Sequence, residues 1–218
     1  MKKDTIIILG TAHLATTPGK CSPDGRLREY AYSRKVVGEI AEALRADGFT
    51  VFIDYMAPNA SPQMKGATWK QEQSRELAWR ANFVNALCAK YGKQNCIYVS
   101  VHVNAAGADG KWHDARGFSV FVSPKGSLDS KHLARCLYEA AQKEGKEVTG
   151  NRCVPESKYW ESNLYVLNNT ACPAVLTENL FQDNLQDVDF LLSSNGRRAI
   201  MRLHVEGIKD FITKYRTT

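Results

Sequence analysis

Short apolar runs alternate with longer amphipathic segments along almost the whole chain, and no other sequence feature restricts the fold as strongly. The apolar runs, which we expect to be strands, cover residues 5–9, 50–54, 97–103, 117–122, 164–167 and 174–177. The amphipathic segments, which we expect to be helices, cover residues 28–46, 71–91, 130–145 and 196–215. This alternation is typical of parallel sheets with helices on both faces. It predicts an α/β fold with a mostly parallel, twisted sheet of about six strands.

The length of 218 residues suits one domain with a single core, and no linker or low-complexity segment interrupts the pattern. We therefore expect residues 1–218 to form one domain. The net charge of +6 indicates an anionic partner. Because the Lys and Arg residues are scattered, charge alone does not choose among nucleic acid, a membrane surface and a cell-wall polymer.

The N-terminal sequence MKKDTIIILG resembles the start of a signal peptide only superficially. Its apolar run covers residues 6–9, whereas a signal peptide needs about 7 to 15 apolar residues. A membrane-spanning helix needs about 20, and the sequence contains no such run. We expect neither a signal peptide nor an integral membrane segment in this chain.

Three polar residues follow or close predicted strands, where the ligand sites of such sheets lie. His13 comes just after the first strand, His102 lies near the end of the run CIYVSVHVNAA, and Glu178 closes the run ACPAVLTEN. Glu29 lies in the first turn of the helix that follows the first strand, so it should face the same edge. We expect these four side chains to lie close together.

Glu29 belongs to the apolar stripe of its helix, together with Ser33, Val36, Val37, Ile40 and Leu44. A buried carboxylate is costly without a partner, so nearby histidines would explain it better than a favourable charge at the helix N-terminus would. Two histidines and one carboxylate form a set that holds zinc in hydrolases. Glu178 would then be the carboxylate that handles protons without binding the metal. His113, His132 and His204 are expected to be ordinary loop or helix residues.

Several segments resemble the zinc-dependent N-acetylmuramoyl-L-alanine amidases of bacteria and phages, whose catalytic domain has a phosphorylase/hydrolase-like fold. SVHVNAA is similar to the family's S-x-H-x-N-A strand, and PAVLTENLFQDN to its segment with the catalytic glutamate. DGRLRE matches the step from glycine to a glutamate ligand, and LYVLNNTACP keeps the family's order before the glutamate strand. LAWRANFVN resembles a helix signature with Leu77, Arg80 and Asn85.

The resemblance implies a Zn2+ ion held by His13, Glu29 and His102, with Glu178 as the catalytic residue. Arg80 and Asn104 are candidates for contacts with a ligand residue or the substrate, although Asn104 could equally be a strand-end turn residue. The sequence differs from the family in GTAHLAT, where Thr11, Ala12 and Leu14 replace an Asp and glycines around the histidine. It also has FIDY where the family often has an arginine after the second strand.

The resemblance further implies hydrolysis of the amide bond between N-acetylmuramic acid and L-alanine in peptidoglycan. Peptidoglycan would be the partner, rather than nucleic acid, and a monomer is favoured. No separate cell-wall-binding module is expected. The enzyme would act at the cell wall or periplasm, reached by phage-type release from the cytoplasm or by a signal absent from this sequence.

Two other functions stay open. The same site would serve a zinc peptidase or deacylase that acts on a small amide, and the same fold would serve a cell-wall binder without activity. Four aromatic residues in the predicted loops could either stack on sugars or pack locally, namely Trp69, Trp112, Tyr159 and Trp160.

Overall fold

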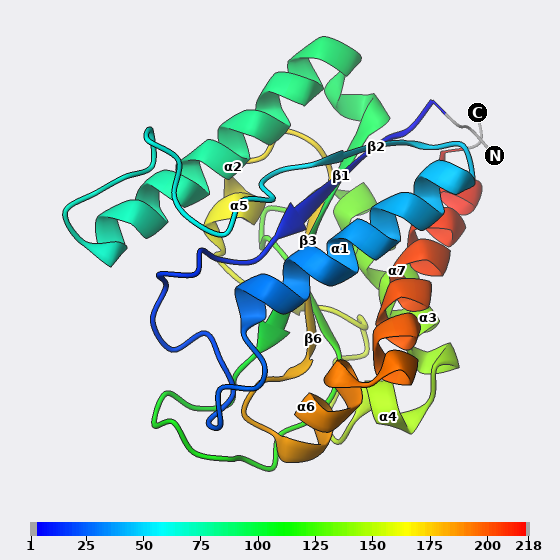
Figure 1. Cartoon of the computed structure of the whole chain (residues 1–218). Coiled ribbons are helices and arrows are strands. Elements are labelled where there is room, and N and C mark those ends of the chain that lie inside the picture. Colours follow the sequence, from blue (N-terminus) through cyan, green and yellow to red (C-terminus); the bar gives the residue numbers. More distant parts are fainter. Residues whose placement is uncertain (1–3, 217–218) are drawn as a thin grey trace.

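Six strands form one sheet at the centre of the computed structural model, which describes residues 4–216 (Figure 1). The strands are β1 Ile6–Thr11, β2 Thr50–Ile53, β3 Cys96–Asn104, β4 Ser119–Val122, β5 Trp160–Glu161 and β6 Ala174–Phe181. Their order in the sheet is β2-β1-β3-β6-β4-β5. All neighbours pair in parallel except β4 and β6, which are antiparallel. The predicted α/β class with a mostly parallel sheet is confirmed.

Helices cover both faces of the sheet (Figure 1). They are α1 Glu29–Ala46, α2 Trp69–Tyr91, α3 Leu128–Lys143, α4 Lys146–Thr149, α5 Tyr165–Asn168, α6 Leu185–Leu192 and α7 Ser194–Tyr215, with a short 3-10 helix at Lys93–Asn95. The helices α1, α3, α6 and α7 contribute to the larger apolar core on one face. The helices α2 and α5 contribute to a smaller core on the other face.

The apolar strand runs are continuous because both faces of the sheet are buried. In β1, Ile7 and Leu9 point into the larger core, whereas Ile6 and Ile8 point into the smaller one. The stripe expected on α1 is also confirmed, since its four aliphatic members Val36, Val37, Ile40 and Leu44 are all buried in the larger core.

One predicted strand was wrong. Residues 164–167 were expected to be a strand, but Tyr165–Asn168 is the one-turn helix α5. Its backbone closes helical hydrogen bonds, such as Asn169 N to Tyr165 O at 3.0 Å, and the adjacent Val166 and Leu167 are both buried. A short apolar run does not distinguish a strand from a helical turn. The sixth strand is instead β5, a two-residue segment that pairs with β4.

The helix α6 was not predicted, although its start carries a recognisable signal. Asn184 accepts a hydrogen bond from the backbone N–H of Asp187 at 3.1 Å and so caps the helix. The Asp187 carboxylate is itself buried, and it accepts hydrogen bonds from the backbone of Phe181 and Gly117. The helix therefore fixes the chain that leaves β6.

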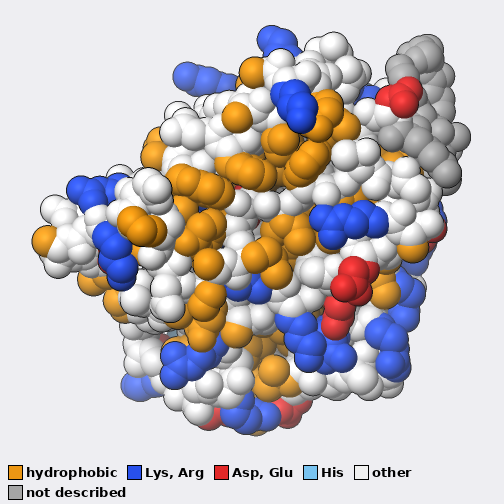
Figure 2. Space-filling model, turned by 45° about the horizontal axis from the view of Figure 1, so that its top comes forward, with side chains coloured by type: hydrophobic (Ala, Val, Ile, Leu, Met, Phe, Trp, Pro, Cys, Tyr) orange, Lys and Arg blue, Asp and Glu red, His pale blue; other side chains and the backbone are white. Residues whose placement is uncertain are grey.

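The surface agrees with the scattered charge in the sequence. On the face shown in Figure 2, Lys and Arg side chains are spread out, with few acidic side chains and several hydrophobic ones between them. Within residues 4–216, no helix is both long enough and apolar enough to cross a membrane.

His204, on α7, is a buried core residue rather than part of a site. Its Nδ1 lies 2.7 Å from Ile200 O, and its Nε2 lies 2.9 Å from Thr177 Oγ1. The carbonyl must accept, so Nδ1 carries the hydrogen and Nε2 accepts from the hydroxyl. Burial lowers the pKa of His204 to about 4.

This lowered pKa predicts a loss of stability in mild acid. Between about pH 6.5 and 4, the unfolded chain binds this proton and the folded protein does not, so the free energy of unfolding falls as the pH falls. The contribution is on the order of 3 kcal/mol. Urea unfolding across this range should show a shallower pH dependence for His204→Gln than for the wild type. Equal slopes would contradict the prediction.

Candidate metal centre

The structure brings together the side chains that the sequence singled out. His13 follows β1, Glu29 is the first residue of α1, His102 lies in β3 and Glu178 lies in β6. His102 and Glu178 are register partners on adjacent parallel strands, so their side chains leave the sheet on the same face. The four residues therefore share one edge, although they are far apart in the sequence.

Glu29 bridges the two histidines. Its Oε1 lies 3.0 Å from His102 Nδ1, and its Oε2 lies 3.3 Å from His13 Nε2. The two imidazole rings are 5.0 Å apart and nearly perpendicular. One ligand atom from each of the three residues lies within 4.8 Å of the others. This is a compact set of three donors around one point.

The protonation states favoured by the site suit a metal ion. Burial alone would raise the pKa of the Glu29 carboxyl, but the adjacent His13 and His102 outweigh burial and hold the pKa well below its usual value. Burial lowers the pKa of His102, which favours the neutral imidazole that binds metals. Glu29 Oε2 is buried and lies 3.3 Å from His13 Nε2 and 4.0 Å from Lys20 Nζ. An ionised carboxylate placed between two histidines fits zinc.

Glu178 lies beside this set and does not belong to it. Its Oε2 is shielded from solvent and has no hydrogen-bond partner among the described residues. Burial, followed by the negative charge of Glu29, raises the pKa of Glu178 well above its usual value. A carboxyl group with a raised pKa is suited to proton transfer near neutral pH.

A β-bulge follows Glu178 directly. The register of β3 and β6 shifts between His102 and Asn104, and Leu180 adopts a positive φ of 64°. The Asn179 side chain donates to His102 O at 2.8 Å. The bulge thus holds the backbone of a predicted metal ligand, a role that the sequence reasoning missed because it acts on a main-chain carbonyl.

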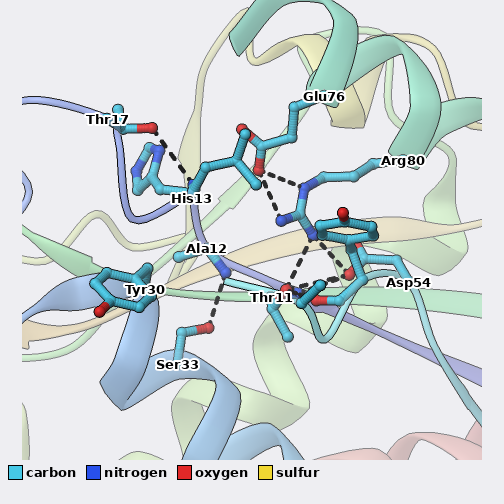
Figure 3. A network of polar contacts seen from close by, with 12 residues as sticks. Thr11, Ala12, His13, Thr17, Tyr30, Ser33, Asp54, Glu76 and Arg80 are labelled. Carbon is cyan, nitrogen blue, oxygen red and sulfur yellow. Dashed lines mark hydrogen bonds and ion pairs between the residues drawn. The ribbon is translucent and has the colours of Figure 1, made fainter. Parts of the chain in front are cut away.

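The helix α1 holds the loop that carries His13 (Figure 3). Ser33 accepts from Ala12 N at 2.8 Å and donates to Val101 O at 2.6 Å, so one hydroxyl joins the ends of β1 and β3. His13 itself has a positive φ of 41°, which is unusual for a side chain with a Cβ. Its conformation therefore needs support from its surroundings.

Arg34 supplies much of that support. Its Nη1 donates to Ala12 O at 2.7 Å, and its Nη2 donates to His13 O at 2.8 Å. The same guanidinium also donates to Met56 O and Ala57 O, in the segment after β2. Burial is the main reason why the pKa of Arg34 falls to about 10, a value that still leaves it charged at neutral pH. The sequence reasoning missed Arg34 because its partners are backbone carbonyls.

A second buried network meets the same loop from the other side (Figure 3). Arg80 pairs with Asp54 at 2.6 Å and with Glu76 at 2.7 Å, and it donates to Thr11 Oγ1 at 3.1 Å. Asp54 also accepts from Tyr98 OH at 2.9 Å. Arg80 is 2% exposed, so the contact it makes near the site is with Thr11, two residues before His13. Its predicted role toward a ligand or substrate stays a prediction.

The remaining predicted residues lie as follows. Asn104 Oδ1 accepts from Ala105 N at 2.9 Å, a local contact that fits the strand-end alternative, and a role toward a metal ligand stays a prediction. His132 stacks on Tyr215, and His113 contacts Asp109. Of the four aromatic residues, Trp69 and Trp112 are exposed, Tyr159 is buried and Trp160 is half-buried.

Comparison with known proteins relates this chain to one family. The family model described as N-acetylmuramoyl-L-alanine amidase matches residues 7–210. The endolysin of Bacillus phage SPP1 is 31% identical over 137 residues, which are 63% of this chain and 45% of that protein. The amidase CwlM of Bacillus licheniformis is 29% identical over 143 residues, 63% of this chain and 46% of that protein. The chain thus spans about half the length of these curated relatives.

Solved structures share the fold. The CwlD amidase of Clostridioides difficile, solved in complex with the GerS lipoprotein, superposes with a TM-score of 0.78 at 21% identity, covering 96% of this chain and 98% of that chain. The amidase Ami1 of Mycobacterium smegmatis gives a TM-score of 0.74 at 19% identity, covering 96% and 97%. Both neighbours have the α/β fold described above.

The hydrogen bonds from Arg34 to the carbonyls of Ala12, His13 and Ala57, which we call the Arg34 clamp, lead us to expect an effect on metal binding. Arg34→Lys cannot reach the carbonyls of Ala12, His13 and Ala57 together, so the His13 loop should relax. We expect the affinity for zinc to fall about tenfold or more, measured by competition with a chromogenic chelator. The exposed neighbour Lys35 provides the control, as Lys35→Met should bind zinc like the wild type. Unchanged affinity in Arg34→Lys would show that the clamp does not act on the site.

Proposed function

The chain belongs to the N-acetylmuramoyl-L-alanine amidase family, and from this premise we propose that it is a zinc-dependent peptidoglycan hydrolase. The bond cleaved is the amide between N-acetylmuramic acid and L-alanine. The observation that carries the proposal is the set of His13, Glu29 and His102 beside the unpartnered carboxyl of Glu178.

The side chains divide the chemistry between them. His13, Glu29 and His102 hold the metal, and a zinc ion bound there supplies Lewis-acid chemistry toward an amide carbonyl. Glu178 accepts a proton from the attacking water and delivers it to the nitrogen of the leaving amine. Because Glu178 is not part of the ligand set, its oxygen stays available for the proton.

The two alternatives explain less of the site. A cell-wall binder without activity has no use for a shielded carboxyl group that lacks a hydrogen-bond partner, and such a group costs stability. A zinc peptidase or deacylase for small amides would use the same four residues. The names of the relatives, an endolysin and cell-wall amidases, favour peptidoglycan as the substrate and the cell wall as the place of action.

Purified peptidoglycan provides the first test. The protein should release new amino termini on L-alanine, a chelator should stop the release, and added zinc should restore it. Release that continues without zinc would contradict the metal requirement. An active site that binds zinc and cleaves small amides, but not peptidoglycan, would favour the peptidase alternative.

Two substitutions separate metal binding from proton transfer. His102→Ala should lose most of its zinc, since it removes one of three ligands. Glu178→Gln should keep about one zinc per chain and lose activity by about 100-fold or more, because it removes the proton acceptor and leaves the ligands. Zinc content is measured by atomic emission, and activity by amine release.

Each substitution has a matched control outside the site. His113→Ala removes a histidine that contacts Asp109 in a loop, and Glu156→Gln changes an exposed glutamate. Both should behave like the wild type. Loss of zinc in Glu178→Gln would move Glu178 into the ligand set and remove its role as the base.

A further inference from the structure

A row of residues extends from the metal centre across three strands. His102 in β3 is the register partner of Glu178 in β6, and Glu178 is the register partner of Ser119 in β4. Register partners project from the same face of a sheet, so all three side chains lie on the face of the candidate active site. Arg152 continues the row, because its Nη1 donates to Ser119 Oγ at 3.1 Å.

Aromatic rings hold the Arg152 guanidinium in place. Its central carbon lies 5.1 Å from the centre of the Trp160 ring and 5.6 Å from the centre of the Phe181 ring. Trp160 in turn lies against Phe121, with 5.9 Å between the ring centres. These contacts fix the plane of the partly buried Arg152 guanidinium beside Glu178. Because the guanidinium is already oriented, little conformational entropy is lost when it binds a ligand.

Arg152 lacks the partner that a partly buried arginine usually has. Among residues 4–216, no carboxylate lies within ion-pair distance of it. The other nearby cation differs in this respect, because Lys20 Nζ lies 4.0 Å from Glu29 Oε2. An oriented guanidinium with free donors is suited to bind a carboxylate through two parallel hydrogen bonds.

The distance of Arg152 from the metal centre indicates which part of a substrate would carry the carboxylate that it binds. Ser119 lies two strands from His102, which is about 10 Å, or about three residues of extended peptide. An amide cleaved at the metal joins an uncharged sugar lactyl group to a peptide. Close to that bond, negative charge is therefore found on the peptide side.

We propose that Arg152, with Trp160 and Phe181 beside it, forms a subsite that binds a carboxylate of the peptide stem a short distance beyond the scissile amide. This inference rests on the proposed amidase function and adds a specificity to it. The guanidinium fixes the direction in which the peptide crosses β6 and β4, and thereby aligns the amide between the metal centre and Glu178.

Two synthetic muramyl dipeptide amides test the subsite. In one the second peptide residue is glutamate, and in the other it is glutamine, so the pair differs by one carboxylate. The glutamate compound is also supplied as its isomer with the free carboxyl on the α carbon. Binding is measured by calorimetry on the zinc-loaded Glu178→Gln protein, and kcat/KM is measured on the protein with Glu178 intact.

The carboxylate compound, in at least one isomer, should bind about tenfold or more tightly than the carboxamide. Arg152→Met keeps the apolar stem and should abolish this preference, whereas Arg152→Lys should restore part of it. The control is Arg135→Met, which alters another arginine that lies over an aromatic ring, that of Tyr159, with its centre 5.9 Å away. Arg135 is exposed on α3 and the variant should keep the full preference.

The outcomes separate the subsite from the amidase function. A preference that is absent in the parent protein, or that survives in Arg152→Met, overturns the subsite even if both compounds are hydrolysed. Failure of both compounds to bind overturns it as well. A preference in binding that depends on Arg152, without hydrolysis of either compound by the intact protein, supports the subsite and contradicts the proposed reaction.

Discussion

The burial of one carboxylate, Glu29, determines the arrangement of everything around it. A buried charge is tolerated only with close partners, and Glu29 has His13, His102 and the backbone N–H of Val103. The two histidines come from different segments, His13 from the loop after β1 and His102 from β3. A single side chain at the start of a helix thus ties the loop after β1 to β3.

Two further residues of α1 also hold the segments around the metal centre in place. Ser33 and Arg34 lie one turn after Glu29, and the three residues contact, respectively, the histidine side chains, the strand ends and the His13 carbonyl. Because a helix has fixed geometry, the three contacts keep constant spacing. The apolar residues of α1 that follow are packed in the larger core. The precision of the site therefore depends on core packing that lies well away from it.

The sequence was informative where a side chain acts through its own chemistry at a predictable place. His102 and Glu178 close strands, and Glu29 interrupts an apolar stripe, so strand ends and helix periodicity locate them. Arg34 and Asn179 were missed because they bind main-chain carbonyls, whose positions only the folded chain defines. The run at 164–167 was too short to choose between strand and helix.

The partners of buried charged residues were also not predictable from the sequence. The sequence has Thr11 where an acidic residue was expected, and it has Asp54 where an arginine was expected. In the structure both take part in one network with Arg80, so the acid comes from the end of β2 rather than β1. A comparison made one position at a time counts Thr11 and Asp54 as two separate differences from the family. The structure shows that both residues bind the same arginine.

The reversed direction of β4 places a second connecting segment at the edge of the candidate metal centre. Since β4 runs against β6, the segment that leads into it, residues 105–118, lies at the metal edge. Both ends of this segment are anchored to the chain after β6, through Asp183 to Ala106 and Gly107 and through Asp187 to Gly117. The middle of the segment is held as well, because His113 N donates to Asp183 O at 2.7 Å and Asn184 donates to His113 O at 2.8 Å. The chain that leaves β6 therefore sets the course of the loop beside the candidate metal centre.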